Sequence, residues 1–147
     1  MNLCPQLRRL SAENARWLAK AARRAREEEA GLAARLLLLW DTEILPHVRI
    51  AEEVLLPELA RRLSEADALI VFTLADHVLL RRLARELCEA RGRAQAVASA
   101  ALVQKLQEHV AFEERTLFPA IQEELGCGRL AALASELEPT SPVDKKG

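Results

Sequence analysis

The chain has no tyrosine and few aromatic residues, with two tryptophans and three phenylalanines among its 147 residues. Its core must therefore be built mainly from aliphatic side chains, and leucine and alanine are abundant. β-branched residues are scarce, and no run alternates apolar and polar residues as a half-buried strand would. Because leucine, alanine, arginine and glutamate are strong helix formers, the sequence predicts an all-α protein without strands.

Long apolar runs and an excess of one charge are also missing. The longest nearly apolar run, Leu36 to Trp40, is far too short to cross a membrane. The N-terminus lacks the basic-then-apolar order of a signal peptide. The formal net charge is −1, which does not suit a nucleic-acid partner. We therefore expect no membrane and no nucleic-acid partner.

Cysteine is rare, and the three that occur, Cys4, Cys88 and Cys127, form no CxxC pair. An odd number without a pair favours free thiols in a reducing compartment, so we expect a cytoplasmic location. Cys88 follows His77 by eleven residues, three helical turns along one face, which predicts a buried space-filling role.

Apolar periodicity and helix-breaking residues divide the chain into helices. The expected segments are approximately residues 5–29, 32–63, 66–90, 93–125 and 129–138. Pro46 and Pro57 fall inside the second segment and Pro119 inside the fourth, so the second should be bent or broken and the fourth interrupted. Four long amphipathic helices with short connections predict an antiparallel up-down-up-down four-helix bundle over residues 1–138. The short C-terminal fifth helix would lie across one end, and residues 139–147 should form a flexible polar tail.

The three histidines each fall on the apolar face of a different long helix. His47, His77 and His109 lie near the middle of their helices, which alternate in direction, so they can meet at one level of the core. The first helix has Asn14 at the corresponding place. Glu113 lies one turn after His109 on the same face. Imidazole with carboxylate suits iron, zinc or manganese, so we predict a metal site there, with a metal-free polar cluster as the alternative.

Residues 109–119 are the most informative stretch, and residues 47–57 repeat it at an offset of 62 (109 − 47). The repeat keeps the histidine, the following valine, one glutamate, the apolar pair and the proline. It does not keep the carboxylate four residues after the histidine, because Ala51 stands where Glu113 stands in the later copy.

Together with Ala75-Asp76-His77, these two blocks make residues 7–137 similar to the hemerythrin-like, HHE cation-binding family. The resemblance implies a four-helix bundle that holds two irons, bridged by two carboxylates and an oxo or hydroxo group. It also implies reversible oxygen binding, sensing of oxygen or iron, or a response to nitric oxide. The family pattern has a histidine where this chain has Asn14 and a bridging glutamate where it has Ala51, so both departures fall on the first iron.

Two neighbouring divalent metals need anionic bridges to offset their repulsion, and one bridge with three histidines does not provide them. We therefore predict a single metal, most simply iron, held by His47, His77, His109 and Glu113. Zinc, or no metal, is left open.

Four other carboxylates lie near these positions in the sequence. We expect Asp76 and Glu114 to be solvated charges, although either could orient a histidine. Glu43 or Glu52 could replace the missing carboxylate, and Glu43, one turn before His47, is the better placed.

We expect a metal-binding protein that handles iron or senses dioxygen, nitric oxide or redox state. A metal-free relative that acts as a structural or protein-interaction bundle is the alternative. We expect no enzymatic activity and no catalytic residue, because no nucleophile or acid–base pair beyond Glu113 supports one.

Overall fold

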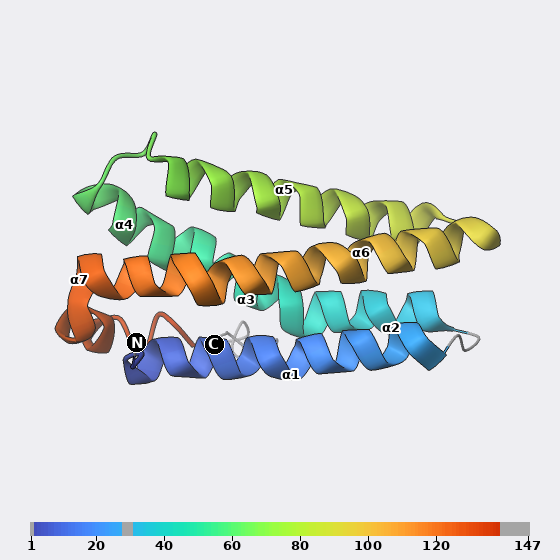
Figure 1. Cartoon of the computed structure of the whole chain (residues 1–147), viewed down its shortest axis with the longest axis horizontal. Helices are drawn as coiled ribbons and strands as arrows, with labels where there is room; N and C mark the ends of the chain where they lie inside the picture. Colours follow the sequence, from blue (N-terminus) through green and yellow to red (C-terminus); the bar gives the residue numbers. More distant parts are fainter. Residues whose placement is uncertain (1, 28–30, 139–147) are drawn as a thin grey trace, which may run out of the picture.

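A computed structural model describes residues 2–27 and 31–138 (Figure 1). No strand occurs within these ranges, so the all-α prediction is confirmed. The helical elements in chain order are α1 (Pro5–Glu27), α2 (Leu32–Leu39), η1 (Trp40–Ile44), α3 (Leu45–Ile50), η2 (Ala51–Leu55), α4 (Leu56–Arg62), α5 (Ala68–Glu89), α6 (Arg93–Phe112), η3 (Glu113–Leu117) and α7 (Phe118–Ala132).

These elements form four long antiparallel rods, as the sequence predicts. Figure 1 shows α1, the bent rod from α2 to α4, α5, and the rod from α6 to α7 running in alternating directions along the long axis. The rod α5 packs on α6, and α1 contacts both α2 and α6. None of the helices in the described ranges is long and apolar enough to span a membrane.

The three prolines inside the rods do not end them, because a π-helical turn precedes each one. The turns η1, η2 and η3 end two residues before Pro46, Pro57 and Pro119. At each turn the residue before the proline donates its backbone amide to a carbonyl five residues back. A wider turn suits these places, since proline has no amide hydrogen and its ring crowds the carbonyl four residues back. The turns η2 and η3 stand 62 residues apart (113 − 51), so the sequence repeat is also a structural repeat.

Two apolar clusters fill the bundle, one on each side of a polar layer. Along α1, the buried Leu7 and Leu10 belong to one cluster, the buried Asn14 follows, and Trp17 belongs to the other cluster. The rod from α6 to α7 repeats this order, since Leu106 and Leu117 lie in different clusters with buried histidine and glutamate between them. The polar layer is thus enclosed at mid-bundle by aliphatic packing.

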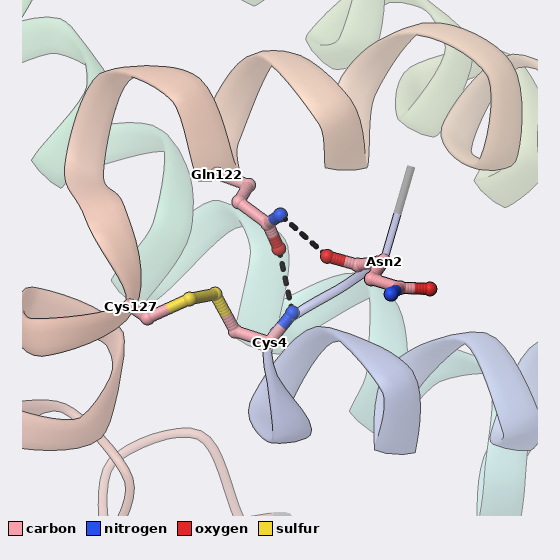
Figure 2. The surroundings of a disulfide bond; sticks show 4 residues. All are labelled: Asn2, Cys4, Gln122 and Cys127. Atoms are coloured by element: carbon pink, nitrogen blue, oxygen red, sulfur yellow. Dashed lines mark hydrogen bonds between the residues drawn. A yellow bond between two sulfur atoms is a disulfide. The ribbon is translucent and has the colours of Figure 1, made fainter.

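A disulfide joins Cys4, just before α1, to Cys127 in α7, so the prediction of three free thiols is wrong for this pair (Figure 2). The side chain of Gln122 fixes the same place: its Oε1 accepts a hydrogen bond from the Cys4 amide at 2.6 Å, and its Nε2 donates to the Asn2 carbonyl at 2.8 Å. Cys88 is free but exposed, so its predicted role as a buried filler is also wrong. The expected cytoplasmic location stays a prediction, without the support of three free thiols.

The C-terminal piece follows a backbone break at Gly126, where φ is +77°. Beyond this break the chain is helical to Ala132, and residues 133–137 form turns, so the predicted short final element is present with an earlier end than expected. The predicted polar tail, residues 139–147, lies outside the described residues.

Candidate metal centre

Five buried polar side chains meet in the polar layer, and they include all four residues predicted from the sequence. Asn14 comes from α1, His47 from α3, His77 from α5, His109 from α6 and Glu113 from the first position of η3. Each is at most 5% exposed. The four rods therefore each contribute at least one polar group to a single enclosed level of the core.

Glu113 occupies the middle of this group. Its Oε1 lies 3.5 Å from Nε2 of His47 and accepts a hydrogen bond of 3.0 Å from Nδ2 of Asn14. Its Oε2 lies 3.6 Å from Nε2 of His109. The ring of His77 stands edge-on to that of His109, with the ring centroids 5.0 Å apart. Two imidazole Nε2 atoms from different rods thus face one carboxylate.

Each histidine is also held from outside by a carboxylate at its other ring nitrogen, Nδ1. The pairs are His47 with Glu13 (3.3 Å), His77 with Glu52 (2.9 Å) and His109 with Asp76 (2.8 Å). A carboxylate at Nδ1 places the hydrogen there, which leaves Nε2 as the atom that can bind a metal. Metal-binding histidines almost always have such a partner.

Two of these outer carboxylates correct an expectation, and the third was not predicted. Asp76 is 6% exposed and orients His109, so the prediction of a solvated charge is wrong for it. Glu52 pairs with Nδ1 of a histidine and receives both ends of the Arg81 guanidinium at 2.7 Å, so it is not a replacement ligand. Glu13 was not predicted. The one feature of the sequence that could have pointed to it is its position directly before Asn14.

The two remaining candidate carboxylates point elsewhere. Glu43 accepts hydrogen bonds from Lys20 Nζ, the shorter 2.9 Å long, and faces Arg16 at 3.6 Å, so it does not replace the carboxylate missing at Ala51. Glu114 is half-buried and accepts hydrogen bonds from Ser11 and Asn14, so it is not a freely solvated charge.

Burial and neighbouring charged groups shift the pKa values of the residues in this layer. Burial lowers the pKa of His47, but hydrogen bonds to Glu113 and Glu13 outweigh this and raise it to about 9. Burial also lowers the pKa of His109, but Asp76 and Glu113 outweigh this and raise it to about 9. Burial tends to raise the pKa of Glu113, but its histidine partners hold it well below the ordinary value. The pKa of His77 is lowered, first by burial and then by the charge of the neighbouring His109.

Three polar atoms of this layer are buried without a hydrogen-bond partner: Nε2 of His77, Nε2 of His109 and Oδ1 of Asn14. Leaving such an atom unpaired costs about 1–3 kcal/mol. Three unpaired atoms beside one carboxylate form a donor set that a cation would satisfy. The separations of 3.5 and 3.6 Å from Glu113 oxygens also resemble the roughly 3.3 Å between two ligands of a tetrahedral metal with bonds near 2.0–2.1 Å.

No three histidine, cysteine, aspartate or glutamate side chains within residues 2–27 and 31–138 are arranged tightly enough to hold a metal as they stand. Metal binding at this layer would require the side chains to draw together. Ala51, 3% exposed at the start of η2, offers no oxygen to a second metal, and the Asn14 amide nitrogen is used to hold Glu113.

One small cavity, of about 80 Å³, reaches this layer from outside. It lies between α1 and the stretch from η1 to α3, and it is lined by Glu13, Arg16, Trp17, Thr42, Glu43, Pro46 and His47. The cavity thus contacts the outer carboxylate and the ring of His47, on the side where the sequence departs from the two-iron pattern.

Comparison with known proteins agrees with this geometry. A family model described as the hemerythrin HHE cation binding domain matches residues 2–124. Neither the curated proteins nor the solved structures provide a match. The match includes residues of all four rods and every polar residue of the central layer. The chain belongs to the hemerythrin HHE cation-binding domain family.

Proposed function

We propose that the chain binds one metal ion, most simply iron, through Nε2 of His47, His77 and His109 and the carboxylate of Glu113. Its role would be iron handling, or sensing of dioxygen, nitric oxide or redox state. The observation that carries this proposal is the set of three carboxylates at the histidine Nδ1 atoms, which turns the opposite nitrogens of all three rings toward the layer.

The donor set fits one divalent metal of intermediate softness. Three imidazoles and a carboxylate suit ferrous iron and zinc. A bound iron would supply a redox-active centre able to bind a small ligand such as dioxygen or nitric oxide. The chain's own residues orient the rings, neutralise the ion's charge and exclude bulk water, since every ligand candidate is buried.

The cavity beside His47 supports a route for small molecules. The cavity lies on the side of the layer where Asn14 takes the place of a family histidine. A bound ion would have the fewest protein ligands on that side. We do not propose catalysis, because the groups that face Glu113 among the described residues are the histidines proposed as ligands and the Asn14 amide.

The test is the metal content of untagged protein purified without chelator, measured by plasma mass spectrometry with an absorption spectrum. We expect about one metal per chain in the wild type and none in His109→Ala or Glu113→Gln. Glu114→Gln is the matched control, because it removes the next carboxylate along the chain and should retain the metal. Two irons per chain would contradict the single-metal proposal.

A metal-free bundle is the second candidate, and one observation favours it. Two imidazolium rings around one carboxylate already compensate its charge, at ion-pair distances of 3.5 and 3.6 Å, so the buried charge of Glu113 does not require a cation. Absence of metal from the wild type, even after anaerobic loading with ferrous iron, would establish this alternative and direct the search to protein partners.

A further inference from the structure

The outer face of α5 carries an apolar stripe at helical spacing. Val71, Leu74 and Val78 lie three and four residues apart and are 51%, 42% and 65% exposed. Ala75 is exposed between them, and Phe72, 51% exposed, lies beside the stripe. Apolar side chains on a protein surface usually occur singly, whereas a contiguous set marks an interaction site.

The position of α5 in the bundle leaves this stripe accessible. Figure 1 shows α5 along one edge of the molecule. Its buried positions, which include Ile70, Thr73, His77 and Leu80, face the core. The stripe lies on the opposite side of the helix.

Charges of opposite sign flank the stripe. Asp67, the half-buried N-cap of α5, stands four residues before Val71, and its Oδ1 accepts a hydrogen bond of 2.9 Å from the Leu69 amide. Arg82 stands four residues after Val78 on the helix face of the stripe. Arg82 is exposed, and its contact with Glu86 of its own helix, 3.7 Å long, is a weak surface ion pair. Exposed Glu65 and Arg85 extend the same pattern, with acid before the stripe and base after it.

This arrangement is complementary to itself when two copies meet in opposite directions. If Val71 of one copy lies opposite Val78 of the other, the paired residue numbers sum to 149 (71 + 78). Asp67 then lies opposite Arg82 (67 + 82), and the same contacts recur at the other end by two-fold symmetry. A parallel arrangement would instead place Arg82 against Arg82.

We propose that the chain self-associates through this α5 stripe into a two-fold dimer with antiparallel α5 helices. The apolar residues supply the contact area, and the Asp67–Arg82 pairs select the antiparallel register. A contact made by one helix per copy falls at the small end of stable interfaces, so the dimer should dissociate on dilution.

Sedimentation velocity over a concentration series tests the proposal on the full chain. We expect a reversible monomer–dimer equilibrium in the wild type, and at least a tenfold weaker dimer in Val78→Glu. Val97→Glu is the matched control: Val97 is 71% exposed on α6, away from the stripe, and its substitution should leave the dimer unchanged. Circular dichroism melting of each variant confirms that it folds. A wild type that stays monomeric at every concentration, or equal loss in both variants, overturns the proposal.

Register is tested by charge and by cross-linking. Arg82→Glu should weaken the dimer severalfold because it faces Asp67, whereas Arg49→Glu, an exposed reversal on α3, should not. In a Cys88→Ser background, Ala75→Cys lies next to the two-fold axis and should form a covalent dimer under mild oxidation. A dimer that Arg82→Glu leaves unchanged would refute the antiparallel arrangement, and absence of the Ala75→Cys cross-link would refute the stripe as the interface.

Discussion

Raising the pH should tighten metal binding steeply, because two of the proposed ligands hold protons in the metal-free protein. The pKa of His47 and that of His109 are both raised to about 9 by their carboxylate partners. A metal must displace those protons to reach Nε2. At pH 7 each displacement opposes about two pKa units, or roughly 2.7 kcal/mol, so the pair reduces affinity by about ten-thousand-fold.

The affinity should therefore rise by about a hundredfold per pH unit near pH 7 and level off above pH 9. His77 and Glu113 add little to this slope, since the pKa of each is lowered and neither holds a displaceable proton near neutrality. The assay is anaerobic ferrous titration against a competing chelator at several pH values. Calorimetry in buffers of different ionisation enthalpy should count about two protons released per metal at pH 7.

The metal-free protein should show the opposite trend in stability. A histidine whose folded-state pKa is raised from 6.5 to about 9 stabilises the fold fully below pH 6.5, and that contribution disappears as the pH rises through 9. The melting temperature of the metal-free form should thus fall across this window. A flat affinity profile with no proton release would refute the reasoning, because it would mean that both rings are neutral before metal binds.

Three further predictions concern single features of the site and the fold. Asp76→Asn should weaken metal affinity by about tenfold to a hundredfold in the chelator assay, because an amide polarises the histidine it holds less than a carboxylate does; unchanged affinity would contradict its orienting role. Cys127→Ser should lower the free energy of unfolding by up to about 5 kcal/mol in urea, since the disulfide closes a loop between residues 123 apart, whereas Cys88→Ser should change little. Asn14→His combined with Ala51→Glu should bring the iron content from about one to about two per chain; failure to gain the second iron would show that the geometry of the first side no longer matches that of the second.

The ligand candidates were predictable because their signal is local. A histidine and a glutamate four residues apart share a helix face, and the core side of each rod follows from its apolar periodicity. The level at which the rods meet followed from their alternating direction. Helix geometry was enough to bring Glu113 to His109 of its own rod and to His47 of another.

The outer carboxylates were not predictable in the same way. Glu52 reaches Nδ1 of a histidine on another rod from the turn η2. A π turn takes an extra residue and rotates every later side chain relative to a regular α-helix. A prediction that assumes regular α-helices therefore assigns such residues to the wrong helix face. Whether Asp76 is buried depends on the packing of α5 against α6, which no single-helix pattern contains.

The disulfide depends on closure of the whole bundle. Cys4 and Cys127 lie at opposite ends of the sequence, and only an even number of alternating rods returns the last to the starting end. The expected four-rod topology already contained this information. Counting cysteines without the topology gave the wrong interpretation.

The Cys4–Cys127 bond also determines how the molecule responds to force. A pull applied between residue 2 and residue 138 passes from the start of α1 directly into α7 through two sulfur atoms. The chain between them, with every histidine and Glu113, forms a covalent ring outside the path of tension. A translocating protease or unfoldase that pulls on residue 2 or residue 138 would therefore reach the disulfide first. It would have to pass two chain segments at once, or the disulfide would have to be reduced, before the polar layer could be unfolded.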